Sequence, residues 1–299
     1  MKASTHTEIY RPFDGEIRER ALRFVPIALS GIRVGFKKKL PLLLLFGPLA
    51  ITCIVYCVMV NVRFTLESGQ ALEGQRLQAQ MMAAAMETLL AVSKLIVDFM
   101  QRAQFFALLA ITWYGGGLIA EDRRLGAHLL YFSRPITRTD YVLGKLGVCF
   151  WFGALAVVYP VIVINLVAAF SSPDWSYVTG EGDVIWKSIL FALFWVLAVA
   201  SLVLCVSSLV ARKTFALVSV FGIVMLVEAV ANVAAEITDD AHFRIASLFT
   251  NFAHLANYLF DRELVQPWNP LLSLALIVAG IAGALTVVWL RVRRLEVVG

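Results

Sequence analysis

Charged side chains are scarce in this sequence. Only 16% of the 299 residues are Asp, Glu, Lys or Arg, whereas 60% are hydrophobic and the mean hydropathy is +0.79. A soluble domain carries roughly 25% charged residues, so most of this chain is suited to the interior of a lipid bilayer. The net charge of +5 does not indicate nucleic-acid binding, because the basic residues stand at the ends of apolar runs, where they set membrane topology.

Sequence signatures of catalysis and of nucleotide binding are also missing. The chain has no GxxxxGK(S/T) phosphate-binding loop, no HExxH and no GxSxG, the patterns that would indicate an ATPase, a metalloprotease or a serine hydrolase. The four cysteines lie inside apolar runs without metal-ligand spacing, and we expect His242 and His254 to be surface residues. We predict no active site, metal or cofactor on this chain. A self-sufficient transporter or intramembrane enzyme is an alternative that no motif supports.

Six apolar segments are long enough to cross a bilayer, which takes about 20 mostly apolar residues. They are residues 40–60, 103–120, 146–170, 189–211, 215–235 and 271–290. Positive charges gather in every second interval between them. The four clusters are Arg33 with Lys37, Lys38 and Lys39; Arg123, Arg124, Arg134, Arg138 and Lys145; Arg212 with Lys213; and Arg291, Arg293 and Arg294. Because Lys and Arg concentrate on the cytoplasmic side, we predict that both termini are cytoplasmic.

The segments outside the spans predict further helices. Residues 1–25 have the composition of a polar cytoplasmic tail without the apolar core of a signal peptide, and residues 26–299 form a single six-span domain. Residues 26–39 predict a short helix on the inner leaflet, with a merely basic flank as the alternative. On the outer side we expect a helix over residues 72–100 that runs into the second span, and an amphipathic helix over residues 242–260. A seventh span is the alternative for the first of these outer helices.

Among the polar residues inside the predicted spans, we single out Asn165, Glu228 and Asn232. Polar groups are costly to bury in a membrane and are therefore functional candidates. They either line a path for a substrate or form hydrogen bonds that hold the helices together.

The segment between the second and third spans, residues 121–145, is the most informative. It has about 25 residues where two to eight suffice for a connection, and it carries five basic and three acidic side chains. Glu121 and Asp122 favour a helix over residues 123–132, because acids stabilise the positive end of a helix dipole, and Pro135 would end it. A short helix beneath the membrane fits a groove on a soluble partner. The alternative is a solvated basic loop.

This segment resembles the first intracellular loop of type-2 ABC transporter permeases. In that family an acidic residue, a glycine, an apolar pair, a Ser/Arg-Pro-x-Ser/Thr-Arg step and a Gly-Lys pair precede the third span. The matching residues here are Glu121, Gly126, Leu129 with Leu130, Arg134-Pro135, Thr137-Arg138 and Gly144-Lys145. The resemblance implies a docking surface for an ATPase on this loop. The predicted docking residues are Glu121, Asp122, Arg123, Arg124, Gly126, Leu129, Leu130, Arg134, Pro135, Arg138 and Lys145.

The resemblance also implies an all-α permease that works as a dimer, with a second copy or with a sister permease, in a bacterial inner membrane. Each permease would receive a cytosolic ABC ATPase subunit that holds ATP and Mg, and the loop helix, called a coupling helix, would pass ATP-driven motion to the spans for export. The interval of residues 61–102 is longer than compact members need. It leaves open the alternative of a non-transporting module that drives an extracytoplasmic partner.

Overall fold

The computed structural model describes residues 22–67, 91–127 and 136–295, and within these ranges every regular element is helical, as predicted. The helices are α1 (Phe24–Phe36), α2 (Lys39–Glu67), α4 (Val92–Gly115), α5 (Ala120–Arg124), α7 (Arg138–Gly153), α8 (Tyr159–Ser171), α9 (Ser176–Gly180), α10 (Gly182–Leu209), α11 (Lys213–Thr238), α12 (Leu248–Leu259) and α13 (Pro270–Leu295). Three short segments complete the list: the π-helix η1 (Ala154–Val158) and the 3₁₀-helices η2 (Pro173–Trp175) and η3 (Ala241–Ala246).

Six helical segments are long and apolar enough to cross a membrane, which confirms the predicted number. The second differs from the prediction at its start, because α4 begins at Val92 and its first turns are largely buried. Asp98 is one of the charges that made this part of the sequence look unlike a membrane span. Its carboxylate lies 3.3 Å from the guanidinium of Arg262, in the segment after α12. Residues 92–100 of the predicted outer helix over residues 72–100 are therefore the beginning of α4. Residues 68–90 lie outside the described residues.

The third span runs through α7, η1 and α8 without a break, although it contains Pro160. Proline has no backbone N–H, and its ring collides with the carbonyl four residues earlier in an α-helix. The π-turn η1 lies just ahead of it, with the Tyr159 N–H bonded to the carbonyl of Ala154, five residues back. The wider turn accommodates the proline, so the helix continues.

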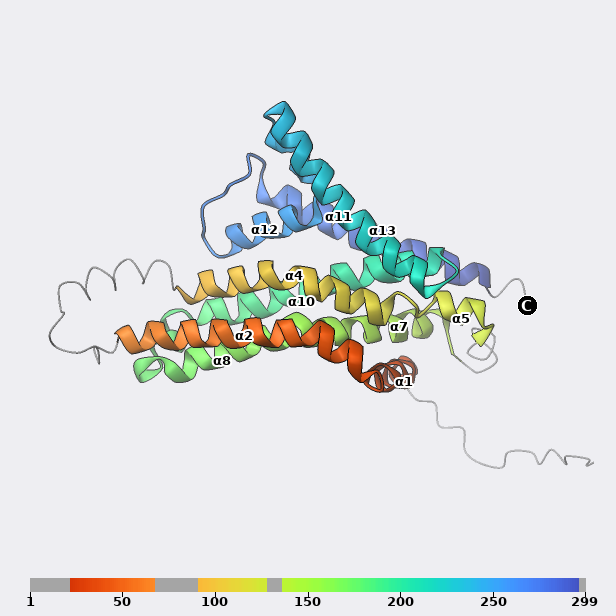
Figure 1. The fold of residues 1–299 in the computed structure, drawn as a ribbon, viewed down its shortest axis with the longest axis horizontal. Helices are drawn as coiled ribbons and strands as arrows, with labels where there is room; N and C mark the ends of the chain where they lie inside the picture. Colours follow the sequence, from red (N-terminus) through yellow and green to blue (C-terminus); the bar gives the residue numbers. More distant parts are fainter. Residues whose placement is uncertain (1–21, 68–90, 128–135, 296–299) are drawn as a thin grey trace, which may run out of the picture.

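Figure 1 shows α4 and α10 side by side in the middle of the bundle, with α2 and α8 along one side and α11, α12 and α13 on the other. More than half of the residues in the most apolar stretches of the second, third and fourth spans are buried, against less than a quarter in the other three spans. The peripheral helices α2, α11 and α13 therefore present apolar faces, with Leu43, Ile51, Val218, Leu226 and Leu271 among the exposed side chains.

The described members of the four clusters of basic residues lie at one end of the molecule. Figure 1 shows α1, α5, the turn between α10 and α11, and the C-terminal end of α13 together at this end. We call it the basic end. The end of α2, the end of α8 and the start of α4 lie at the other end, while the tip of α11 and α12 lie beside the bundle, away from the basic end (Figure 1). The alternation of charge along the sequence therefore corresponds to a separation in space.

The predicted amphipathic helix over residues 242–260 is two helices, η3 and α12, separated at Ser247. The Ser247 hydroxyl accepts a hydrogen bond from the Thr250 N–H at 2.9 Å and so caps α12. The aromatic face of α12 packs on α10, where Phe252 is fully buried and its ring contacts Phe191 at 5.9 Å and Trp195 at 6.4 Å between centroids. This helix is thus fixed to a span by its apolar side.

Helix α1 packs along α7 at the basic end, and glycines make the close approach possible. A Cβ on Gly144 would lie 2.7 Å from the Cβ of Ile27, and one on Gly31 would lie 2.5 Å from Val148. Gly31 and Gly35 of α1 are four residues apart, on one helix face, the spacing by which small residues bring membrane helices together. The expected short N-terminal helix is present, and these glycines, which weaken its amphipathic pattern, are its contact surface.

We predict that Gly144→Ala lowers the thermal unfolding midpoint in detergent, because the new methyl group forces α1 away from α7. Overpacking of this kind costs about 1–3 kcal/mol. The matched control is Gly283→Ala in α13, where an added Cβ has no atom within 4 Å. Equal midpoints for the two variants would show that the α1–α7 contact does not require glycine.

Candidate functional site

A buried ion pair joins α5 to α7 at the basic end. The Lys145 ammonium lies 2.7 Å from Oδ2 of Asp122, and the Tyr141 hydroxyl donates a hydrogen bond to the same oxygen at 2.8 Å. Lys145 is only 6% exposed and Tyr141 is fully buried. A buried ion pair persists where good geometry and further hydrogen bonds offset the desolvation of both charges. Asp122 and Lys145, both predicted docking residues, thus hold the beginning of the loop against the start of the third span.

A second set of contacts joins α5 to the end of α10. The Arg123 guanidinium donates a hydrogen bond to the Ser208 carbonyl at 2.6 Å. The buried Ser207 hydroxyl accepts from the N–H groups of Ile119 and Ala120, at 3.1 and 3.3 Å. These N–H groups belong to the first turn of a helix, where they have no partner within the helix. Helix α5 is therefore fixed to two spans besides the one that it follows.

The predicted helix over residues 123–132 is interrupted in its described part. Glu121 and Asp122 lie in the first turn of α5, which ends at Arg124, and Gly126 has a φ of +69°. This left-handed conformation favours glycine and interrupts a helix. Residue 127 is helical again, and residues 128–132 of the predicted helix lie outside the described residues. Four predicted docking residues lie outside the described residues, namely Leu129, Leu130, Arg134 and Pro135.

The tip of the α5 turn is open to a partner. Leu125 is 70% exposed and Arg124 beside it is also exposed. On the other side of the loop, Arg138 opens α7 directly after Thr137, whose side chain forms a reciprocal capping box with Asp140. Both ends of the loop are thus held in place, and the apolar Leu125 lies at the surface between Arg124 and Gly126.

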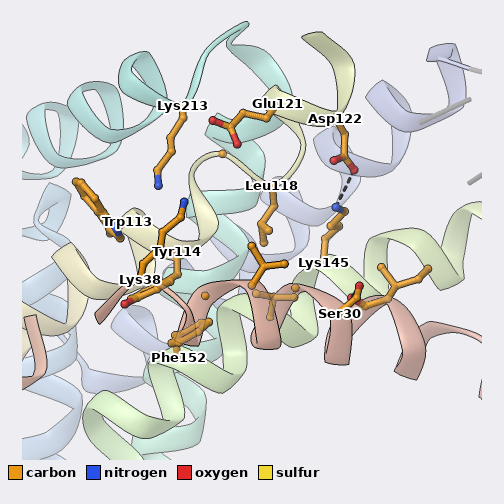
Figure 2. Close-up of a pocket in the computed structure, with 16 residues that line it drawn as sticks. Ser30, Lys38, Trp113, Tyr114, Leu118, Glu121, Asp122, Lys145, Phe152 and Lys213 are labelled. Atoms are coloured by element: carbon orange, nitrogen blue, oxygen red, sulfur yellow. Dashed lines mark hydrogen bonds and ion pairs between the residues drawn. The ribbon is translucent and has the colours of Figure 1, made fainter. Parts of the chain in front are cut away.

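A pocket of about 240 Å³ lies behind α5, between α1, α4, α7 and the first residue of α11. Figure 2 shows its polar wall, with Glu121, Lys38 and Lys213 around the opening and the Asp122–Lys145 pair at one side. From the sequence, Lys38 and Lys213 were assigned only to the basic clusters that set the membrane topology. Their proximity in this pocket depends on the tertiary fold.

The intramembrane Asn165 is the centre of a buried hydrogen-bond network. Its amide nitrogen donates to the Ser188 hydroxyl at 3.0 Å and to the Val161 carbonyl at 2.8 Å. Its amide oxygen accepts from the Tyr177 hydroxyl at 2.7 Å. Burial raises the pKa of Tyr177 above its usual range, so this hydroxyl remains a donor at neutral pH. The geometry favours a role in joining α8, α9 and α10.

Glu228 and Asn232 form a second polar cluster, between α11 and η3. The Asn232 amide donates to Oε1 of Glu228 at 3.0 Å, and the Ser247 hydroxyl donates to Oε2 of the same carboxylate. Ser247 is fully buried, whereas Glu228 is half-buried. The cluster therefore joins a span to the cap of α12.

His254 is buried, so its predicted surface position is wrong; His242 has 63% of its side chain exposed. His254 lies on the inner face of α12, where its Nε2 is 2.9 Å from the Trp268 carbonyl. Among the residues that the structure describes, no three His, Cys, Asp or Glu side chains are grouped closely enough to hold a metal ion.

These features define a polytopic α-helical membrane protein in which a short helix, anchored between the second and third spans, presents an exposed turn at the basic end. A family model described as ABC-2 family transporter protein matches residues 39–291. The chain therefore belongs to the ABC-2 family of transporter permeases, as the loop resemblance indicated. A search of curated proteins finds no match. Family members generally lack an ATP-binding site of their own, so this chain is the membrane component of a transporter.

We predict that Lys145→Met destabilises the protein by about 3 kcal/mol, because it removes the cation that lies 2.7 Å from the largely buried Asp122 carboxylate. The double variant Asp122→Asn/Lys145→Met should recover most of this loss, since the amide is neutral and still accepts from Tyr141. Thermal unfolding of both variants in detergent measures the difference. Equal losses in the single and double variants would exclude a coupled pair.

We also predict that Asn165→Leu costs about 1–3 kcal/mol, because it removes the hydrogen-bond partner of the buried Tyr177 hydroxyl. Adding Tyr177→Phe should restore part of the stability. The same unfolding assay checks both variants. A loss of transport without loss of stability would instead place Asn165 on a substrate path.

Proposed function

We propose that this chain is the membrane-spanning subunit of an ATP-driven exporter and receives a separate cytosolic ABC ATPase at the α5 turn. The observation that carries the proposal is the combination of an exposed apolar tip, Leu125, with a rigid base. The base is fixed by the Asp122–Lys145 pair and by the Arg123–Ser208 hydrogen bond. A surface that receives mechanical work must both contact the partner and resist being pulled out of its own fold.

The contacts of α5 supply the route by which ATPase motion reaches the spans. A displacement of the turn acts on α7 through Lys145 and on α10 through the Ser208 carbonyl. Both helices belong to the well-packed centre of the bundle. Packed cores move between discrete arrangements and do not deform continuously. Docking and closure of the ATPase would therefore shift whole spans.

The charge distribution supports an orientation with the basic end in the cytoplasm. Lys and Arg are enriched on that side of membrane proteins, and the described members of the four clusters lie together here. We place both chain termini in the cytoplasm and the protein in a bacterial inner membrane. ATP and Mg would be bound by the partner ATPase.

The peripheral helices support a dimeric permease. Large apolar side chains of α2, α11 and α13 are exposed on the single chain, and lipid covers such faces as well as a protein does. A second copy or a sister permease would cover part of them, and lipid the rest.

The second candidate function is a module that moves an extracytoplasmic partner without transporting cargo. The observation that favours it is the contact of Glu228 in α11 with Ser247, the cap of α12. Through this contact a shift of the span would reach the helix at the end opposite the ATPase. Reconstituted protein with its ATPase separates the two functions, because only the exporter has ATP hydrolysis stimulated by cargo.

We predict that Leu125→Asp weakens binding of the ATPase by roughly 30-fold, since an apolar anchor at an interface contributes about 2 kcal/mol or more. Pull-down of the tagged permease from native membranes, with mass spectrometry of the bound proteins, measures the loss. The matched control is Val265→Asp, an equally exposed apolar residue between α12 and α13, with 72% of its surface accessible.

The control should retain the full amount of a Walker-motif ATPase. If Leu125→Asp retains it as well, the α5 turn is not the docking site. If no ATPase accompanies the unmodified chain, the proposed coupling itself is wrong.

A further inference from the structure

Two lysines from distant parts of the chain converge on the pocket behind α5. Lys38 comes from the junction of α1 and α2, and Lys213 is the first residue of α11. Figure 2 shows their ammonium ends pointing toward one another across the pocket opening. Two like charges at close range repel each other, so this arrangement is unfavourable unless an anion lies between them.

The described residues of the pocket supply too little negative charge. Asp122 is already paired with Lys145 at 2.7 Å. Glu121 is the remaining carboxylate of the lining, and it faces two lysines. Across the described part of the chain neither Lys38 nor Lys213 has an ion-pair partner within 4 Å, and the recorded contact of Lys213 is with the ring of Trp113, at 4.5 Å. One positive charge is therefore left over.

The aromatic wall adds hydrogen-bond donors that have no acceptor. Tyr114 is 8% exposed and lines the pocket, and its buried hydroxyl has no hydrogen-bond partner within the described ranges. The indole N–H of Trp113, in the same wall, is also buried and unsatisfied there. Burying a hydrogen-bond donor without an acceptor costs free energy, and buried donors without an acceptor are rare in proteins. This second observation is independent of the charges, and a ligand with acceptor oxygens would satisfy these donors.

We propose that this pocket binds a phosphate-bearing anion, held by the ammonium groups of Lys38 and Lys213 and by the N–H of Trp113. A phosphate group offers several acceptor oxygens and at least one negative charge, and lysine binds it as a compact point charge. The volume of about 240 Å³ equals that of roughly eight water molecules, enough for a phosphate and the beginning of its ester group.

The position of the pocket indicates where such an anion comes from. One side is α1, which exposes Leu29, Val34 and Phe36 as helices at a membrane surface do. On the cytoplasmic side, anionic lipids present phosphodiester groups at that level. A phospholipid headgroup and a soluble phosphate ester share this chemistry, and the experiment distinguishes them.

Occupation of the pocket would hold the beginning of α11 against α5. Lys38, Lys213 and the α5 residue Glu121 belong to three elements that meet at this place. Neutralising the two lysines joins the peripheral α11 to the element that we propose as the ATPase docking site. Binding of the anion is independent of that function, so failure of one proposal leaves the other standing.

The test compares binding to purified, delipidated full-length protein in detergent by native mass spectrometry. The probes are dioleoylphosphatidylglycerol, the phosphate-free dioleoylglycerol, glycerol-1-phosphate and inorganic phosphate. The pocket variant is Lys38→Gln/Lys213→Gln. Its control is Lys37→Gln/Arg212→Gln, which removes the same charge from the neighbouring positions, both exposed and outside the pocket lining.

We expect the pocket variant to bind phosphatidylglycerol at least about tenfold more weakly, because each lost charge-assisted hydrogen bond weakens binding by a factor of this order. The control and dioleoylglycerol binding should not change. If the tenfold loss is instead seen with glycerol-1-phosphate or inorganic phosphate, the ligand is a soluble phosphate. Equal binding of every probe by pocket and control variants overturns the proposal.

A second pair of variants keeps the test decisive if the double lysine variant does not fold. Trp113→Phe removes the N–H and keeps an aromatic ring under Lys213, and its control is Trp289→Phe in α13, whose ring lies near Arg293. Weaker phosphate or phosphatidylglycerol binding in Trp113→Phe alone supports the site. Identical binding by both variants contradicts it.

Discussion

The arrangement of the basic end depends on one interaction, the buried ion pair of Asp122 and Lys145. Neither charge is tolerable without the other, so the end of the second span and the start of the third must come together as the helices pack. Once they do, Arg123 reaches the Ser208 carbonyl and the α5 turn faces outward. The pair also forms one wall of the phosphate pocket. The proposed docking surface and the proposed phosphate pocket thus lie on two sides of the same anchored helix.

The six spans and the alternation of charge could be predicted because they depend on the solvent. A run of apolar residues and its basic flanks are local properties of the sequence. They determine which segments enter the bilayer and in which orientation. The early start of α4 could not be predicted in the same way, since Asp98 is acceptable there only because Arg262 lies beside it in the fold. The surface position expected for His254 was wrong for the same reason, as the Trp268 carbonyl that receives its ring is supplied by the tertiary structure.

The loop of residues 121–145 shows which structural properties a sequence motif predicts and which it does not. Its glycine and its charges could be recognised in the sequence. The directions of these side chains could not be predicted, because α5 is a single turn that ends before Gly126, whose φ is positive. Asp122 and Lys145 point inward and Leu125 outward, and sequence spacing does not separate these roles. The α1–α7 contact could have been predicted, because Gly31 and Gly35 have the spacing of small residues at helix–helix contacts. The same two glycines also lower the helix propensity of the segment.

Helix α11 is placed to carry motion between the two ends of the molecule. Less than a quarter of its apolar stretch is buried, so a shift of this helix sacrifices less packing than a shift of α10. It nevertheless has specific contacts at its first residue and in its second half. Lys213 lies in the pocket beside α5, against the ring of Trp113, and Glu228 accepts a hydrogen bond from the Ser247 hydroxyl that caps α12. A loosely packed span with specific contacts at two separate points can move as a rigid body, so a change at Lys213 affects the helix that Glu228 contacts.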